Sequence, residues 1–340
     1  MRVLVLGGTR FLSARIAAEA VAGGHEVTCA ARGVHGRPPE GAAFVEWDRA
    51  EPVPAALADL EVDVVVDVSG EPGWVATAVA AWPAAYWVFI STINVYSDLA
   101  VAGGAENTPT VAPWREGEAS DYGAEKVACE NLVLSGTASA LILRPGLIVG
   151  SDDPSGRFTY WPIHAAEADR DGGGLLIPGA PDDLVQLIDV GDLADWVVRA
   201  AEARQAGVFD AVCPPMTRAE FVAELLAGVR SQDPTPSVAE DQTGQSGSGI
   251  KPVWVPSAEL LDLGIAEWMG PRAIPLWIAD PSASGLMARD VTTSLAAGLI
   301  ARPLAQTVRQ TLQWAETTPD PPVTGLTRDE ERALLDARQS

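Results

Sequence analysis

The first 150 residues alternate short apolar runs with helical patterns, and no other feature constrains the fold as strongly. Apolar runs of strand length lie at residues 2–6, 26–30, 43–47, 62–68, 87–91 and 140–143. After the first run, Leu12, Ile16 and Ala20 recur at the spacing of one helix face. Strands that alternate with helices require crossover connections, which predicts a parallel sheet covered on both faces. The fold class is therefore α/β with a doubly wound sheet, whose ligand binds at the carboxyl ends of the strands.

The pattern changes after Gly150, and this change predicts a second, smaller lobe. Residues 184–188 and 192–203 return to a strand and a helix; further helices are predicted at about 218–229, 304–315 and 327–337, and a strand at 251–255. Residues 231–249 are poor in apolar side chains and rich in Gly, Ser, Pro and Gln, which predicts a mobile surface loop. The predicted organisation is a nucleotide-binding domain at 1–150 plus about 184–213, and a discontinuous substrate-binding lobe at about 151–183 and 214–330.

Charge and composition exclude several classes of function. The chain has 46 acidic and 23 basic residues and a formal charge of −23, which repels nucleic acid and anionic membrane surfaces. Its few cysteines and histidines form no CxxC pair and no metal-ligand cluster, so we predict a reducing compartment and no metal. The N-terminal apolar run is too short for a signal peptide, and no run approaches the roughly 18 apolar residues of a membrane span. We therefore expect a cytoplasmic protein.

The strongest chemical signal is Y-G-A-E-K at residues 122–126, preceded some 30 residues earlier by Ser91 and Thr92. Tyr122 and Lys126 are four residues apart, so a helix places them on one face. A nearby ammonium favours the phenolate and brings a tyrosine, whose ordinary pKa is about 10, toward acid–base work at neutral pH. A hydroxyl from a neighbouring strand end can hydrogen-bond the same substrate oxygen. An isolated Y-x-x-x-K is more often a solvated helix face, but this one lies in a βα array that opens with a glycine turn.

These segments resemble the extended short-chain dehydrogenases/reductases of the NAD-dependent epimerase/dehydratase type. The resembling motifs are G-G-T-R-F-L at 7–12, F-I-S-T-I-N-V-Y at 89–96, Y-G-A-E-K at 122–126 and L-R-P-G at 143–146. The resemblance implies a Rossmann-type domain with a bound dinucleotide. It assigns the catalytic hydroxyl to Thr92, with Ser91 beside it, and the acid–base pair to Tyr122 and Lys126. The family includes dimers, so a homodimer is an open possibility that no residue pattern here establishes.

The later part of the chain resembles an atypical subgroup of reductases. The shared segments are R-F-T-Y-W at 157–161, L-I-D-V-x-D-L-A at 187–194 and G-L-x-x-R-P-L at 298–304. Gly191 stands where a basic residue is expected, which leaves the role of that turn open.

The glycine turn departs from the usual dinucleotide fingerprint. Gly7 and Gly8 can form the tight turn, but Arg10 and Ser13 replace the other two glycines. Arg10 lies at a helix N-terminus, where its guanidinium can pair with a phosphate. The alternative is a degraded loop with Arg10 in solvent.

The end of the second strand bears on cofactor choice. Residues 29–33 read C-A-A-R-G, with Arg32 where an NAD site usually has a carboxylate, so NADP is the preferred cofactor and NAD stays open. The alternative is that Arg32 is an ordinary exposed loop residue. The predicted cofactor contacts are Gly7, Thr9, Arg10, Phe11, Leu12, Arg32, Asp48, Val68, Ser69, Gly70, Pro145 and Gly146.

The expected substrate is a small carbonyl or alcohol compound. Its candidate contacts are Asp152, Asp153, Arg157, Tyr160 and Trp161, which could equally form a structural aromatic plug. We predict an NADP(H)-dependent oxidoreductase that acts on a ketone or secondary alcohol. The alternatives are a nucleotide-sugar epimerase or dehydratase with retained NAD(P), which needs more basic groups than this lobe offers, and a non-catalytic dinucleotide-binding protein.

Overall fold

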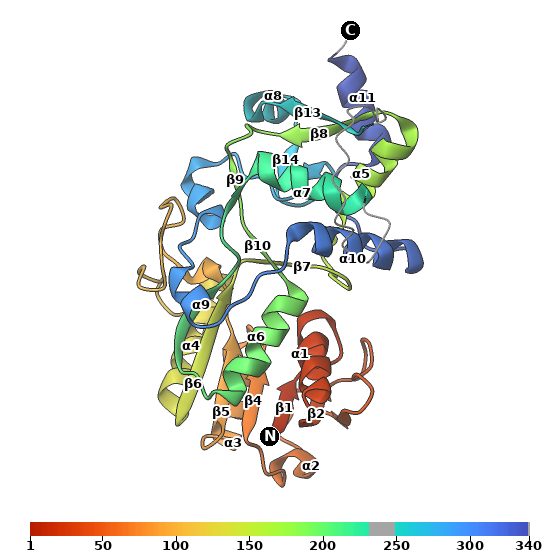
Figure 1. Cartoon of the computed structure of the whole chain (residues 1–340). Coiled ribbons are helices and arrows are strands. Elements are labelled where there is room, and N and C mark those ends of the chain that lie inside the picture. The colour runs from red at the N-terminus through yellow and green to blue at the C-terminus, as the bar shows by residue number, and fades with distance from the viewer. Residues whose placement is uncertain (231–248, 339–340) are drawn as a thin grey trace. The chain divides into compact units, whose positions relative to one another are not determined.

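The computed structural model describes residues 1–230 and 249–338, so nearly all of the loop predicted at 231–249 lies outside the described residues. The chain divides into two compact units (Figure 1). Unit 1 comprises Met1–Ile148, Gln186–Pro214 and Ser282–Ala301, and unit 2 comprises Val149–Val185, Pro215–Pro281 and Arg302–Ser340. No helix in the described part of the chain has the length and apolar character needed to cross a membrane.

Unit 1 is built on a parallel sheet. Within the described residues it has seven strands in the order β11-β6-β5-β4-β1-β2-β3. The strands are β1 (Arg2–Leu6), β2 (Glu26–Ala31), β3 (Ala43–Glu46), β4 (Val64–Asp67), β5 (Tyr86–Ile90), β6 (Ser139–Pro145) and β11 (Gly207–Ala211). From β1 the chain runs outward to β3 and then returns to β4 on the other side, which creates a switch point between β1 and β4. The predicted Rossmann-type doubly wound fold is confirmed.

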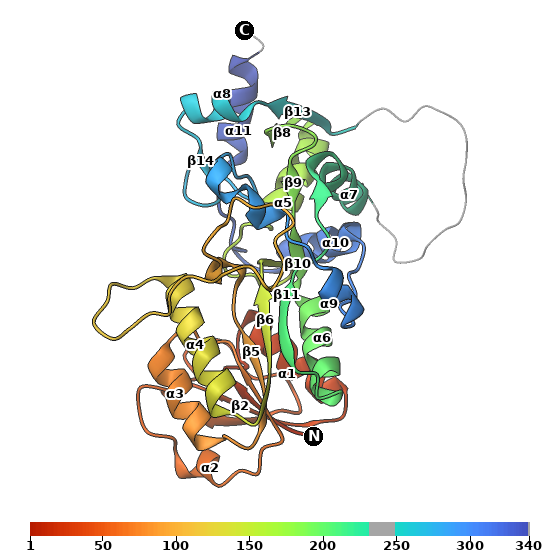
Figure 2. The same cartoon turned by 90° about the vertical axis from the view of Figure 1, so that its left-hand side faces the viewer.

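Helices cover both faces of this sheet. One face is covered by α1 (Phe11–Ala22) and α6 (Val190–Glu202), which lie side by side (Figure 1). The other face is covered by α2 (Ala55–Ala58), α3 (Pro72–Ala81) and α4 (Tyr122–Gly136) (Figure 2). The stripe predicted for the first helix, Leu12, Ile16 and Ala20, is buried against the sheet. Unit 1 also contains η1 (Ile93–Val95), α9 (Thr292–Ala296) and β10 (Leu187–Asp189). The strand β7 (Leu147–Val149), which pairs with β10, begins in unit 1 and ends at Val149, the first residue of unit 2.

Unit 2 is helical with short strand pairs. Its helices are α5 (Tyr160–Asp171), α7 (Arg218–Arg230), α8 (Ser257–Asp262), α10 (Leu304–Thr317) and α11 (Arg328–Ala337). Its strand pairs are β8 (Gly174–Pro178) with β13 (Lys251–Val255), β9 (Leu184–Val185) with β12 (Met216–Thr217), and β14 (Ala266–Glu267) with β15 (Ala273–Ile274). A 3-10 helix, η2 (Pro281–Met287), begins at the end of this segment and continues into unit 1.

Two features differ from the sequence expectation. The single strand expected at 184–188 is split at Gln186, whose side-chain amide donates to the carbonyls of Cys213 and Arg289. Residues 282–301, which the sequence assigned to the substrate-binding lobe, belong to unit 1. They are held there because Arg289 pairs with Asp210 of β11 at 2.8 Å and Ser294 donates to the Asp210 carbonyl at 2.7 Å.

Candidate functional site

Three segments of unit 1 converge around the N-terminal turn of α4. Asp121 caps the helix through its side chain, so Tyr122 is the first helical residue and is half-exposed. A Cβ at Gly123 would overlap the carbonyl of Asn94, so only a glycine lets α4 begin this close to η1. A Cβ at Gly70, after β4, would lie 3.7 Å from both the Tyr122 ring and the Lys126 side chain. The structure therefore brings together the residues predicted from three separate motifs.

Lys126 lies beneath Tyr122 and is almost fully buried. Its Nζ donates to the carbonyls of Val68, Ser69 and Ile90 at 3.2, 2.9 and 2.6 Å. Burial lowers the pKa of Lys126 to about 8, although the carboxylate of Asp67 favours the charged form. The three hydrogen bonds fix the ammonium at the ends of β4 and β5, one helical turn from Tyr122.

The two predicted hydroxyls differ in their surroundings. Thr92 is the N-cap of η1, and its Oγ1 accepts from the Asn94 amide at 3.2 Å. Ser91 is 2% exposed, and within the described residues its Oγ has no hydrogen-bond partner. Ser91 therefore presents a buried, unsatisfied hydroxyl at the end of β5, next to the hydroxyl that the resemblance assigns to catalysis.

The backbone angles of the glycine turn explain why Arg10 and Ser13 can stand where two glycines are usual. Gly7 and Gly8 have φ values of +123° and +83°, and a Cβ at Gly8 would overlap the Cys29 side chain. Arg10 instead has φ −150°, an extended conformation open to any residue, and its side chain is exposed. Ser13 donates its hydroxyl to the Arg10 carbonyl at 2.9 Å. The loop thus keeps glycine only where the backbone requires it.

Phe11 and Leu12 complete this turn. Phe11 has φ +42°, a left-handed conformation that is uncommon for residues with a side chain and often marks ligand-binding turns. Leu12 points into the core on the first turn of α1, and Thr9 is half-buried. The Leu12 side chain therefore packs in the core, and only the Leu12 backbone is left to make the predicted cofactor contact.

A cavity of about 180 Å³ lies beside this turn, at the carboxyl ends of β1, β2 and β4. The residues lining it are Leu6, Gly7, Ala30, Ala31, Arg32, Trp47, Arg49, Val68, Ser69 and Trp74. Predicted residues Gly7, Arg32, Val68 and Ser69 are thus brought together. Asp48 is exposed, accepts a hydrogen bond from the Ala50 amide, and is not among the lining residues of this cavity.

Arg49 is the functional candidate that the sequence reasoning missed. It forms a two-oxygen ion pair with Asp67, with distances of 2.7 and 2.8 Å, and donates to the Trp74 carbonyl at 2.8 Å. A signal was available, because the apolar strand V-V-V-D ends in a carboxylate that must find a partner once it is buried.

Pro145 and Gly146 lie at the end of β6, next to η1. A Cβ at Gly146 would lie 3.3 Å from the Ile93 side chain and closer still, at 2.6 Å, to that of Val212. The predicted nicotinamide-side residues are therefore packed against the segment that begins with Thr92.

A buried ionic network surrounds the same end of the sheet. Arg144 forms a two-oxygen pair with Glu130 at 2.9 and 2.7 Å and donates to the Tyr96 hydroxyl at 3.1 Å. Tyr96 donates to Asp210 at 2.5 Å, and Arg289 lies over the Tyr96 ring at 3.7 Å while pairing with Asp210. Burial raises the pKa of Asp210 despite the opposing effect of Tyr96 and Arg289. This network joins α4, β6, η1 and β11 into one rigid support.

The predicted substrate residues all lie in unit 2 and differ widely in accessibility. Asp152 is exposed and accepts from the Trp314 indole at 3.0 Å. Asp153 is buried and accepts two hydrogen bonds from Ser155, and burial is the main cause that raises its pKa.

The remaining three substrate candidates are less exposed. The Arg157 guanidinium lies over the Trp268 ring at 5.1 Å. Tyr160 and Trp161 are completely buried, with Tyr160 stacked on His164 and Trp161 edge-on to Phe221. The two aromatic residues thus fit the structural alternative that the sequence left open.

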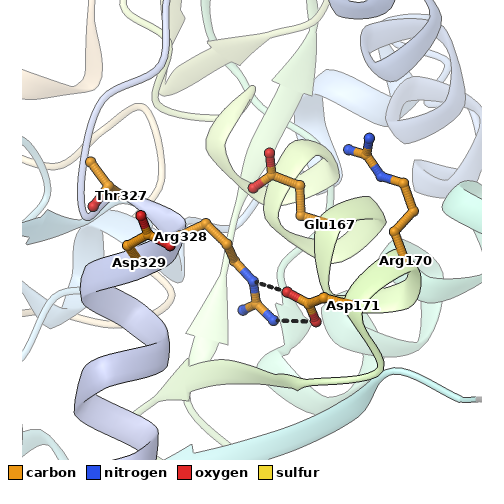
Figure 3. Close-up of a pocket in the computed structure, with 6 residues that line it drawn as sticks. All are labelled: Glu167, Arg170, Asp171, Thr327, Arg328 and Asp329. Atoms are coloured by element: carbon orange, nitrogen blue, oxygen red, sulfur yellow. Dashed lines mark hydrogen bonds and ion pairs between the residues drawn. The ribbon is translucent and has the colours of Figure 1, made fainter.

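Unit 2 also has a surface cleft of about 470 Å³ between α5 and the start of α11 (Figure 3). Arg328 forms two hydrogen bonds with Asp171 there, at 3.2 and 3.1 Å, and it also pairs with Glu331 at 2.9 Å. Arg328 and Asp171 bond to each other and so attach α11 to α5. We therefore interpret this cleft as a packing contact of α11 and not as a ligand site.

The strand order and the glycine turn define a Rossmann-type nucleotide-binding protein. Residues 74–211 match the model of the NAD dependent epimerase/dehydratase family. Over these residues the chain is similar to this family, which agrees with the resemblance to extended short-chain dehydrogenases/reductases that its motifs indicated.

Two curated relatives and one solved structure illustrate the match. The chain is 28% identical over 319 residues to a dTDP-6-deoxy-L-talose 4-dehydrogenase (NAD(P)(+)) of Kitasatospora kifunensis, covering 83% of this chain and 96% of the relative. It is 30% identical over 165 residues, 45% of each chain, to a 2'-dehydrokanamycin reductase of Streptomyces kanamyceticus. The structure resembles a UDP-glucuronic acid 4-epimerase from Bacillus cereus in complex with NAD, with a TM-score of 0.59, 14% identity and coverage of 93% and 97%. The expectation of an enzyme of this class is confirmed by these relatives.

Proposed function

We propose that the protein is an NADP(H)-dependent oxidoreductase that transfers a hydride to or from a ketone or secondary alcohol. The observation that carries the proposal is the convergence of Tyr122, Lys126 and Thr92 at one end of a dinucleotide-type sheet. The two curated relatives, named as a dehydrogenase and a reductase, support redox chemistry over other activities of the family.

The residues present fit a nicotinamide dinucleotide. The turn at Gly7 and Gly8 brings backbone close to β2, and a cavity opens beside it at the switch point of the sheet. A bound nicotinamide would supply or accept the hydride.

The chain's own groups would then handle the proton. Tyr122 is half-exposed, so its hydroxyl can reach a substrate oxygen and give or take a proton there. Lys126 acts through its positive charge, which favours the phenolate. Because its ammonium already donates to three carbonyls, binding a nicotinamide ribose would require it to give up one of them. Thr92 orients the substrate oxygen, with Ser91 available as a second donor.

Arg32 supports NADP over NAD. It lines the cavity at the end of β2, is exposed, and stands where an NAD site usually has a carboxylate. Asp67, a buried carboxylate at this end of the sheet, is neutralised by Arg49. An anionic 2′-phosphate would therefore meet the cationic side chain of Arg32 with no unpaired buried carboxylate of Asp67 opposing it.

The proposed substrate is a small carbonyl compound or the matching alcohol. A net charge of −23 disfavours strongly anionic substrates. Of the predicted contacts, Asp152 and Arg157 are the ones with accessible side chains.

A nucleotide-sugar epimerase or dehydratase with retained NAD(P) is the second candidate. The family match and the fold neighbours support it comparably, since several of those neighbours are named as epimerases or dehydratases. The two candidates differ in whether the cofactor leaves after each turnover.

The test is to bind NADP and NAD separately to the purified protein, and then to add a panel of ketones, including dTDP-4-ketosugars, with NADPH in excess. The proposal predicts tighter binding of NADP than NAD, and loss of NADPH absorbance that is stoichiometric with alcohol formation. Product formation with no net change in nicotinamide redox state would assign the epimerase or dehydratase function. Absence of binding by either dinucleotide at near-millimolar concentration would refute both.

A further inference from the structure

Two arginines anchor residues 282–301 to the rest of unit 1, at different places. Arg199 of α6 donates from Nη1 to the Gly298 carbonyl at 2.9 Å and so ties the segment to a helix. Arg289 lies inside the segment, is 3% exposed, and pairs with Asp210 of β11 at 2.8 Å. Arg289 also makes contacts that anchoring the segment does not require.

These additional contacts hold the Tyr96 side chain. The guanidinium carbon of Arg289 lies 3.7 Å from the centre of the Tyr96 ring, and the Tyr96 hydroxyl donates to the same Asp210 carboxylate at 2.5 Å. The guanidinium of Arg144 lies 5.0 Å from the ring centre, and its Nη1 donates to the Tyr96 hydroxyl at 3.1 Å. Because the ring and the hydroxyl are both bound to buried charges, Tyr96 cannot turn without breaking one of these interactions.

A single turn of 3-10 helix separates Tyr96 from Thr92. Thr92 is the N-cap of η1 and Tyr96 is its C-cap, whose amide donates to the Ile93 carbonyl at 3.3 Å. Hydrogen bonds of a 3-10 turn have poor geometry, so such a turn depends on what fixes its two ends. A displacement of Tyr96 would therefore also displace the Thr92 hydroxyl.

Arg289 also fixes the loop at 97–121, which joins η1 to α4. Its Nη2 donates to the Ala105 carbonyl at 2.7 Å, and the next amide, that of Asp290, donates to the Gly104 carbonyl at 3.0 Å. A Cβ at Gly104 would lie 2.5 Å from Nη1 of Arg289. The glycine therefore lets the loop pass directly against the guanidinium.

We propose that Arg289 is a positioning residue that acts through Tyr96: it fixes η1 and so keeps the Thr92 hydroxyl where it can bond the substrate oxygen. The proposal rests on the proposed function for the role of Thr92. The holding of η1 can be measured without any substrate.

Two variants disturb Arg289 without leaving Asp210 unpaired. Arg289→Lys keeps a cation beside Asp210 but removes the planar group over Tyr96. Gly104→Ala keeps both charges and places a methyl group against the guanidinium. Arg199→Lys is the matched control, because Arg199 anchors the same segment and bonds no residue of η1 in the described part of the chain.

The first readout is turnover, at a temperature where every variant is folded. Misplacing a reacting group by about 1 Å can cost about 10²-fold in rate, so Arg289→Lys and Gly104→Ala should lower kcat by roughly 10- to 100-fold. The KM for the dinucleotide should not change, and Arg199→Lys should keep the wild-type kcat. In a Thr92→Val background, Arg289→Lys should have little further effect, because the group through which it acts is gone.

The second readout is amide hydrogen exchange at residues 93–96. It should be faster in Arg289→Lys and Gly104→Ala than in the wild type and in Arg199→Lys. Full kcat in both variants, or an equal loss of kcat from Arg289→Lys with and without Thr92, would overturn the proposal. Unchanged exchange at residues 93–96 would overturn it as well. Faster exchange there in a protein that reduces no carbonyl compound would support the holding of η1 by Arg289 while the proposed function fails.

Discussion

Buried arginines meet different partners in the two units. In unit 1 the arginines Arg49, Arg144 and Arg289 each pair with a buried carboxylate. In unit 2, Arg218 is equally buried, but its guanidinium donates from Nη2 to the Leu276 carbonyl at 3.1 Å and meets no carboxylate among the described residues at ion-pair distance. Its Nε and Nη1 have no hydrogen-bond partner within the described residues, and neither do the Tyr160 hydroxyl and the Trp161 indole N–H.

The difference arises from where the groups lie. Asp67, Arg144 and Asp210 stand at or near the carboxyl ends of parallel strands, where neighbouring segments arrive in fixed register and can complete each other's bonds. In unit 2 the partnerless groups of Tyr160, Trp161 and Arg218 lie on α5 and α7, helices that pack through aromatic rings such as Trp161 and Phe221. A buried polar group without a partner costs about 1–3 kcal/mol. The carboxylates thus hold the buried arginines of unit 1 in a fixed geometry, whereas Tyr160 and Arg218 of unit 2 carry buried polar groups whose removal the fold should tolerate.

The largest expected effect is on turnover, and it comes from comparing the same substitution at two tyrosines, one in each unit. Tyr122→Phe removes the hydroxyl proposed for proton transfer, so turnover should fall by roughly 10³-fold, while dinucleotide affinity is kept. Tyr160→Phe, the matched control, removes a buried hydroxyl without a partner in the described structure, so it should leave turnover and stability unchanged or raise stability. Steady-state kinetics with NADPH and thermal unfolding measure both. Full turnover in Tyr122→Phe would contradict the proposed mechanism.

The second prediction concerns two buried arginines. Arg289→Met leaves Asp210 buried without its cation, and breaking such a pair costs about 3–5 kcal/mol of unfolding free energy. Arg218→Met removes a cation whose pKa burial lowers to about 10, so the fold gives up an unfavourable charge and loses the hydrogen bond to Leu276. We expect Arg218→Met to change stability by less than about 1 kcal/mol. Urea unfolding of both variants measures this, and equal losses would show that the units do not differ.

Unit 1 also shows how much of the structure the sequence predicts. The strands and the first helix were predicted because apolar periodicity is local, and burial of one face is enough to determine it. The sequence could group Tyr122, Lys126 and Thr92 because their motifs lie at the same end of a parallel sheet, where chain topology itself brings them together.

The missed features depend on pairings between distant segments. The bond between Arg49 and Asp67 joins the loop after β3 to the end of β4, and neither residue belongs to a repeating pattern. Arg289 lies 79 residues after Asp210, so nothing local reveals that residues 282–301 complete unit 1. In unit 2, Tyr160 and Trp161 resembled site residues because aromatic residues near a strand end suit either a cleft or a core, and burial is set by tertiary packing.

The third prediction uses pH to probe the buried lysine of unit 1. Burial lowers the pKa of Lys126 from 10.5 to about 8, so below pH 8 both the folded and unfolded states carry the proton and the burial cost is fully present. Between pH 8 and 10.5 the unfolded state binds more protons, and the stability of the wild type should therefore rise relative to Lys126→Met, by up to about 3 kcal/mol. Chemical unfolding of both proteins across this range measures the difference.

Arg218→Met is the control from unit 2 for this pH series. Because the pKa of Arg218 is lowered only to about 10, the difference in unfolding free energy between Arg218→Met and the wild type should stay constant up to that pH. If the unfolding free energy of Lys126→Met also differs from that of the wild type by a constant amount between pH 8 and 10.5, Lys126 is not buried as a charged group.

The smallest effect compares two helix caps, one in each unit, that stabilise to a similar extent. Asp121 caps α4 of unit 1 by accepting from the Ala124 amide at 2.8 Å, and Thr327 caps α11 of unit 2 in a capping box with Glu330. Replacing either residue with Ala should cost about 1 kcal/mol of unfolding free energy. Tyr122 is the next residue after Asp121, so fraying of that first turn moves the proposed acid–base group, and Asp121→Ala should also lower turnover several-fold. Thr327→Ala should lower stability alone. If the two variants lose turnover equally, the cap on the first turn of α4 does not hold Tyr122 in place. The fixed geometry of the buried arginines in unit 1 would then not extend to the half-exposed Tyr122.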